Sequence, residues 1–189
     1  MVVNGDFESG NSGFSSDFLF TTSNSLPAQY TVGTNPRAWN RNLRSFGDNT
    51  TGSGNMMIVN GSQSAGDVVW RQSIAVNPGT SYDFSMFVRS AFSGSGDSQL
   101  RINGETIGDA FLDGDVSDWL EITRSWSSGL SSTALIEIIN LGTAFGGNDF
   151  AFDDISFIAG DTSAIPVPGA ALLFAPVAAL AASRRRKLR

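Results

Sequence analysis

Two neighbouring stretches of this chain place large side chains at every second position, and this pattern restricts the fold more than any other feature. Positions 68, 70, 72, 74 and 76 hold Val, Trp, Gln, Ile and Val, and positions 82, 84, 86 and 88 hold Tyr, Phe, Met and Val. A period of two is that of a β-strand with one buried face. We therefore expect two strands whose regularly spaced residues, Trp70 among them, belong to a core.

The segment between these stretches carries a turn signal. Residues 77–80 read Asn-Pro-Gly-Thr, in which Pro presets φ and Gly supplies the positive φ of a type II turn. Turn and alternation together predict a β-hairpin. A second hairpin is predicted at Asn103-Gly104, because this dipeptide is a strong hairpin turn signal.

Further short strands, separated by Gly, Ser and Asp, are expected at residues 2–7, 56–59, 99–102, 106–107, 120–126, 134–140 and 150–158. The chain has 21 Gly, too many for a helical bundle, and no helical periodicity precedes its C-terminal segment. Many short strands with such turns are typical of an antiparallel sandwich. The predicted fold is all-β: an antiparallel jelly-roll β-sandwich over residues 1–159, a linker at 160–164, and a single hydrophobic helix within 165–189.

The C-terminal segment differs from the rest in composition. Residues 165–182 form an uncharged, largely apolar run of 18 residues, close to the minimum of roughly 17 that crosses a bilayer. A basic cluster follows and ends the chain: Arg184, Arg185, Arg186, Lys187 and Arg189. The segment is expected to anchor the chain in a membrane with the cluster in the cytoplasm. The alternative is a frayed C-terminal peptide packed on the domain, or a buried helix of the same length.

The order of parts in this segment resembles the PEP-CTERM class of bacterial sorting signals, in particular its VPLPA-like variant. The match starts at Ile165 and continues through Pro166, Val167, Pro168, Gly169 and Ala170. The resemblance implies an exported protein, anchored in the inner membrane until an exosortase-like transpeptidase processes it, and then located at the cell surface or in the extracellular matrix with exopolysaccharide. The Glu of the Pro-Glu-Pro core is absent. Export also requires a secretory signal, which we expect upstream of Met1 in the genome.

Charge and composition exclude several classes of function. Residues 1–161 hold seven basic and eighteen acidic residues, a net charge of −11, so binding to nucleic acid is not expected. The chain has no Cys and no His, and therefore lacks thiolate chemistry and the commonest general base. A glycosidase with paired carboxylates is the one mechanism left open. No pair of acidic residues stands out by context, so we expect a protein without enzymatic activity.

Both ends of the predicted domain resemble CenC-type carbohydrate-binding modules and related galactose-binding-like jelly rolls. The matching stretches are NGDFESG at residues 4–10 and FAFDDISF at residues 150–157, with WRQSI at 70–74 and NPGTSY at 77–82 between them. The resemblance implies that the first and last strands lie side by side. It also implies a structural calcium near them, held first by Glu8 and Asp153 and then by Asp6 and Asp154. The alternative is that these carboxylates are solvated charges in turns and at a sheet edge.

A second acidic stretch, Asp113-Gly114-Asp115-Val116-Ser117-Asp118, begins with the spacing of an EF-hand loop. The pattern then fails, because Asp118 stands where Gly is needed and Arg124 where Glu is needed. A solvated loop is the better interpretation.

Sugar binding would need exposed aromatic faces with hydrogen-bonding side chains beside them. The candidates are Trp39, Trp119 and Trp126, with Arg37, Arg41 and Asn42 near the first. Trp39 could equally cover an edge of the sandwich, and Trp126 fits the core better. Two functions remain: an exported, non-enzymatic surface or matrix protein associated with exopolysaccharide, or a carbohydrate-binding module that recognises a glycan through exposed aromatic residues.

Overall fold

The computed structural model describes residues 1–94, 96–111 and 116–160. Ten strands and one short helix occur there, in the order β1 (Leu19–Phe20), β2 (Gln29–Gly33), α1 (Pro36–Trp39), β3 (Met56–Asn60), β4 (Val68–Ala75), β5 (Ser81–Ser90), β6 (Ser98–Ile102), β7 (Glu105–Phe111), β8 (Leu120–Ser127), β9 (Thr133–Asn140) and β10 (Asp149–Ala159). The strands form two sheets, one of six in the order β1-β2-β3-β10-β5-β8 and one of four in the order β4-β9-β6-β7.

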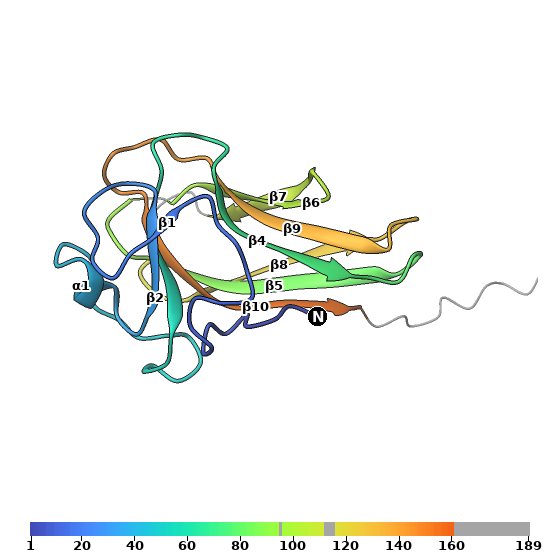
Figure 1. Cartoon of the computed structure of the whole chain (residues 1–189), viewed down its shortest axis with the longest axis horizontal. Helices are drawn as coiled ribbons and strands as arrows, with labels where there is room; N and C mark the ends of the chain where they lie inside the picture. The colour runs from blue at the N-terminus through green and yellow to red at the C-terminus, as the bar shows by residue number, and fades with distance from the viewer. Residues whose placement is uncertain (95, 112–115, 161–189) are drawn as a thin grey trace, which may run out of the picture.

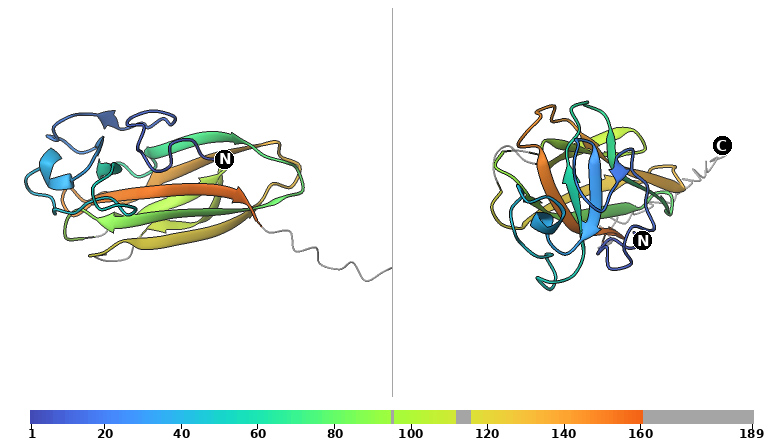
Figure 2. Two further views of the ribbon diagram at one scale, coloured as in Figure 1. Left: turned by 90° about the horizontal axis from the view of Figure 1, so that it is seen from below. Right: turned by 60° about the vertical axis from the view of Figure 1, so that its left-hand side comes forward.

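The two sheets are the two layers of a sandwich (Figures 1 and 2). All strand pairs are antiparallel except β1 with β2, which pair in parallel. The core between the sheets contains fully buried aromatic residues, among them Trp70, Phe84 and Phe152. The prediction of an all-β sandwich is confirmed for the described residues.

The alternating residues of β4 and β5 are buried as the sequence pattern predicts. In β4, Val68, Trp70, Gln72 and Ile74 are buried while Ser73 and Ala75 are exposed. In β5 the four predicted inward residues are all buried: Tyr82, Phe84, Met86 and Val88. Trp126 is also buried against Tyr82 and Phe157. The sequence pattern thus identifies the core face of both strands.

The predicted hairpin at residues 77–80 is wrong. β4 pairs with β9 in one sheet, and β5 pairs with β10 and β8 in the other, so the turn carries the chain across the sandwich. Residues outside the turn stabilise it: Gly79 donates its N–H to Gly129 O (2.6 Å), and Asn77 N–H donates to the Tyr82 hydroxyl (2.8 Å). The second prediction is confirmed: β6 and β7 form a hairpin through Asn103 and Gly104, both at positive φ.

Residues 2–7 do not form the expected strand. The Asn4 side chain accepts from Ser9 N–H (2.8 Å) and donates to Gly10 O (2.9 Å), and these bonds close a local turn instead. The segment still lies beside the last strand, since Ile155 N–H donates to Gly5 O (2.9 Å). Phe7 is fully buried with its ring 5.7 Å from that of Phe152.

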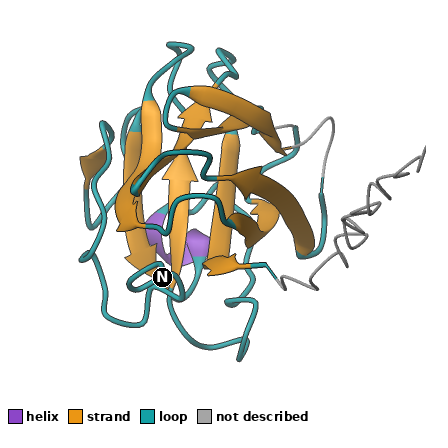
Figure 3. Ribbon diagram, turned by 90° about the vertical axis from the view of Figure 1, so that its right-hand side faces the viewer, coloured by secondary structure: helices purple, strands orange, loops and turns teal. Residues whose placement is uncertain are grey.

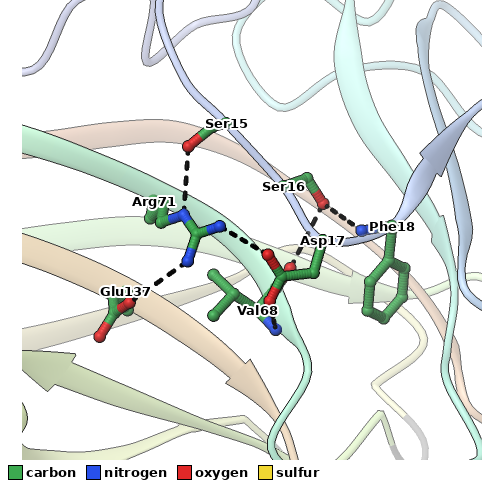
Figure 4. A network of polar contacts seen from close by, with 7 residues as sticks. All are labelled: Ser15, Ser16, Asp17, Phe18, Val68, Arg71 and Glu137. Carbon is green, nitrogen blue, oxygen red and sulfur yellow. Dashed lines mark hydrogen bonds and ion pairs between the residues drawn. The ribbon is translucent and has the colours of Figure 1, made fainter.

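The next residues fasten the N-terminal segment to β4 (Figure 4). Asp17 accepts from the Arg71 guanidinium (2.6 Å) and from Val68 N–H (3.1 Å), while Ser15 forms a bridge with Arg71. Glu137 in β9 lies 3.9 Å from the same guanidinium. The network joins the N-terminal segment to two strands of the four-stranded sheet.

Several predictions fall outside the described residues: the C-terminal helix, the sorting motif at 165–170, the basic cluster at 184–189, most of the linker, and Asp113 and Asp115. Among the residues that the structure does describe, no helix is long and apolar enough to span a membrane.

Candidate functional site

Trp39 does not offer its ring to solvent. It ends helix α1, is 6% exposed, and donates its indole N–H to Thr21 O (3.0 Å). Helix α1 and the loop that follows fold over the outer face of the six-stranded sheet, where Trp39 packs in an apolar cluster with Leu43, Phe46, Met56, Ile58, Ala91 and Ala151. Of the two alternatives for Trp39, an exposed platform or a cover for the sandwich, the structure has the cover.

Trp119 packs against the same cluster and is half-buried. Its indole N–H donates to Gly47 O (3.2 Å), and its ring meets that of Phe46 edge-on, with 5.8 Å between centroids. Arg89 covers the Phe46 ring at 4.3 Å. Both Trp candidates therefore help to close the outer face, Trp39 with its ring buried and Trp119 with part of its side chain still exposed.

A hollow of about 560 Å³ opens at the end of the sandwich where β10 begins. That end also carries α1 (Figure 1, left), whereas β10 runs toward the opposite end of the sandwich; Figure 3, viewed from that opposite end, shows α1 behind the strands. We call this hollow the amide pocket, because four asparagines line it together with two phenylalanines: Asn24, Asn40, Asn42, Asn60, Phe92 and Phe145. The pocket thus combines amide groups with aromatic rings.

The amides are held in place by one another. Asn24 Oδ1 accepts from the side-chain amides of Asn40 (2.7 Å) and Asn60 (2.8 Å). Gln29 Oε1 in turn accepts from the Asn24 amide (3.1 Å) and from Ser25 N–H (2.9 Å). This network joins the end of β3 to two loops, so the polar lining is ordered before any ligand arrives.

Other lining groups remain accessible. The Phe145 side chain is 76% exposed and Phe92 is partly exposed. Asn42 is exposed, and no described residue hydrogen-bonds its side-chain amide. Aromatic faces beside free amides are the groups that bind the C–H faces and hydroxyls of a sugar.

Asp149 contributes a carboxylate to the amide pocket from the first position of β10. Its residue is 9% exposed, and burial raises the pKa of its carboxyl to about 6. Of the described residues that line the pocket, Asp149 alone has an ionisable side chain.

A separate group of carboxylates lies on the outer face of β10, beneath the loop at residues 48–55. Asp153 is 1% exposed and accepts from Asn49 N–H (3.0 Å) and from the N–H of Asp154 (2.8 Å). Burial raises the pKa of Asp153 to about 7, and the nearby charges of Asp154 and Asp48 add to the rise. A buried carboxylate with two acidic neighbours is an unfavourable arrangement without a counter-charge.

Asp48 belongs to this group, although its sequence context does not distinguish it from other loop acids. Its carboxylate accepts from Thr51 N–H (2.8 Å) and Gly54 N–H (2.7 Å). Burial alone would raise the pKa of Asp48, but the hydrogen bonds from its own loop outweigh burial and lower it. Glu8 reaches the same loop by accepting from Asn55 N–H (2.6 Å).

The structure therefore divides the four predicted metal ligands into two groups. Glu8 and Asp153 approach the loop from opposite ends of the sequence, with Asp48 between them. Asp6 and Asp154 line a shallow hollow of about 370 Å³. Asp154, at a φ of 51°, also accepts from the Asn49 amide (2.8 Å). Within the described part of the chain, no three acidic side chains are grouped closely enough to hold a metal ion by themselves.

No protein-family model and no curated protein sequence matches this chain. Among solved structures, a family 16 carbohydrate-binding module matches with a TM-score of 0.51 and 16% identity, over 83% of this chain and 98% of that one. The CBM22-1–GH10 modules of Clostridium thermocellum xylanase 10B, solved with xylohexaose, match with a TM-score of 0.53 and 18% identity, over 82% of this chain.

A tandem of CBM22 modules from Paenibacillus barcinonensis Xyn10C matches with a TM-score of 0.52 and 15% identity, again over 82% of this chain. The match spans 28% of the xylanase chain and 44% of the tandem. At these identities the likeness concerns the fold, which is the jelly-roll sandwich of carbohydrate-binding modules.

Proposed function

We propose that this chain is a non-catalytic carbohydrate-binding module and that the amide pocket holds its glycan. The observation that carries the proposal is the exposed Phe145 ring next to an ordered network of asparagine amides at one end of the sandwich. The fold shared with carbohydrate-binding modules supports it.

Different residues of the pocket would bind different parts of the sugar. Phe145 and Phe92 offer rings to the C–H face of a sugar, while the free amide of Asn42 can exchange hydrogen bonds with hydroxyl groups. Asn24, Asn40 and Asn60 are already fixed by mutual hydrogen bonds. Binding therefore costs little conformational entropy on the protein side.

The test is retention of the full-length chain on polysaccharide affinity gels, followed by titration with the retained glycan. Phe145→Ala and Asn42→Ala should each weaken binding about tenfold, which corresponds to about 1.4 kcal/mol. Leu130→Ala is the matched control, because Leu130 is 98% exposed in the loop at the other end of the sandwich. Wild-type affinity in both pocket variants, or no retention on any polysaccharide, would contradict the proposal.

We further propose that calcium binds beside Asp153 with Asp48 and Glu8. The support is electrostatic, since a buried carboxylate with a raised pKa lies next to other acids and has no basic partner among the described residues. Calcium prefers roughly six to eight oxygen ligands. Backbone carbonyls would have to complete the set, because the side chains are not sufficient alone.

Calcium binding is tested by thermal unfolding in EDTA and in millimolar CaCl2. The midpoint should rise with calcium and not with magnesium, because Mg²⁺ demands a tighter, octahedral site. In the Asp153→Asn variant, calcium should no longer raise the thermal midpoint. An unchanged midpoint in wild type would exclude a structural calcium here.

We also propose, from the sequence alone, that the chain is exported and sorted through its C-terminal segment. Support comes from the Pro166–Ala170 motif, the uncharged run after it and the basic cluster at 184–189. An exosortase-like transpeptidase would remove the segment at the inner membrane and release the module to the surface or matrix, near exopolysaccharide. Mass spectrometry of the protein from an exosortase-bearing host should show a missing C-terminus, and an intact cytosolic protein would contradict the idea.

A further inference from the structure

Asp149 holds a fixed position in the amide pocket. It pairs with Asn60 of β3 in the sheet, and its backbone carbonyl accepts from Ala91 N–H (2.9 Å) just beyond β5. The strand is therefore bonded on both sides at this residue. Asp149 lines the pocket from this rigid base.

The Asp149 carboxylate lacks a partner within the described part of the chain. More than nine-tenths of the residue is buried, yet no described residue donates a hydrogen bond to its oxygens, and its raised pKa has burial as its cause with no charged neighbour involved. The described residues that line the pocket include no Lys or Arg. Arg44, on the loop nearby, directs its guanidinium to Ser90 O (3.5 Å). A buried anionic group without a donor is expected to gain one from a ligand.

We propose that the amide pocket selects a glycan that carries a free, protonated amino group, and that Asp149 provides the counter-charge. The inference rests on the proposed function and specifies its ligand class. An ammonium group can give the carboxylate a charge-assisted hydrogen bond, which is about twice as strong as a neutral one. The exposed ring of Phe145 and that of Phe92 add favourable sites for a cation.

The same arrangement disfavours other ligands. Uronic acids and sulfated sugars would bring a second negative charge next to Asp149, with no described basic side chain in the pocket lining to compensate. A divalent cation would find a single carboxylate, and two of the four asparagine oxygens are already occupied: Asn24 Oδ1 accepts two hydrogen bonds and Asn40 Oδ1 accepts Asn42 N–H (3.0 Å). The ammonium group of an amino sugar, in contrast, needs only the single carboxylate of Asp149 as its counter-charge.

The test compares a glucosamine oligosaccharide with its N-acetylated counterpart of equal length, by calorimetric titration of the full-length chain at about pH 6.5. Wild type should bind the free amine about tenfold more tightly. Asp149→Asn keeps the shape of the side chain and removes its charge. The variant should bind both oligosaccharides with affinities within about twofold of each other.

The outcomes separate this inference from the proposed function. Equal binding of both oligosaccharides by wild type, sensitive to Phe145→Ala, overturns the amino-sugar inference and leaves the carbohydrate-binding pocket intact. A preference for the free amine that persists in Asp149→Asn also overturns the role of Asp149. Binding of neither oligosaccharide, nor of any other glycan, overturns both.

Discussion

At the scale of single residues, β10 carries two buried carboxylates that most strands would not tolerate. Asp149 lies at the amide pocket and Asp153 beneath the loop at residues 48–55. Burial raises the pKa of both, to about 6 and about 7. Such groups lower the stability of the fold when charged. Because one lies at a pocket and the other beneath a loop, a bound ligand or ion could offset this loss of stability.

The pH dependence of stability follows from these two residues. Because their pKa values in the folded chain lie above the value of about 3.9 expected in the unfolded chain, the folded state binds protons more tightly. In EDTA, the free energy of unfolding should therefore increase as pH falls from about 7 to about 4, and below that range the gain stays constant. Urea midpoints measured from pH 7.5 to 5 report this trend.

The double variant Asp149→Asn, Asp153→Asn is the control for this prediction. It should flatten the trend, because it removes the two groups whose pKa values are raised, while Asp154 and Asp48, the acids that face Asp153, remain. Asp48 acts in the opposite direction, because its pKa is lowered, and its contribution is lost only in more acidic solution. A wild-type midpoint that decreases steadily from pH 7.5 to 5 would show that other groups dominate.

At the scale of elements, the strands could be predicted from the sequence but some of their partners could not. Alternation identified β4 and β5 because each strand has one buried face. The Asn77–Thr80 turn has the chemistry of a hairpin turn, yet the chain changes sheets there. Turn residues specify local φ and ψ, whereas pairing depends on β8, β9 and β10, which come later in the chain.

The candidate site was harder to predict for the same reason. The amide pocket draws on residues from Asn24 to Asp149, and no spacing in the sequence brings them together. Trp39 has polar neighbours in the sequence, but it is the apolar residue through which helix α1 packs on the outer face of the sheet. Glu8 and Asp153 could be named because a family resemblance supplied them, while Asp48 had no such signal.

The contact between the N-terminal segment and β10 depends on a glycine. A Cβ added at Gly5 would overlap the Ile155 carbonyl, while one added at Gly33 would meet nothing within 4 Å. Gly5→Ala should therefore lower the free energy of unfolding by about 1–3 kcal/mol, and Gly33→Ala should leave it nearly unchanged. Urea unfolding of both variants measures the difference. Equal stability would mean that the segment can move away from β10 at little cost.

At the scale of the whole molecule, the two ends of the sandwich differ. β10 begins at the amide pocket with Asp149 and ends at Ala159, 11 residues later. At about 3.3 Å per residue, the strand separates the pocket from the start of the C-terminal segment by roughly 35 Å. The proposed C-terminal anchor would therefore follow the end of the sandwich opposite the pocket.

The acidic body should make stability depend on salt. Residues 1–161 carry a net charge of −11, and repulsion among these charges is screened over about 10 Å in 0.1 M salt. We expect the thermal midpoint to rise by about 2–4 °C between low salt and physiological NaCl. Neutralising three exposed acids, Glu105→Gln, Asp109→Asn and Glu121→Gln, should raise the low-salt midpoint and shrink the increment. A midpoint that falls with salt would instead indicate that ion pairs such as Arg71 with Asp17 outweigh the repulsion.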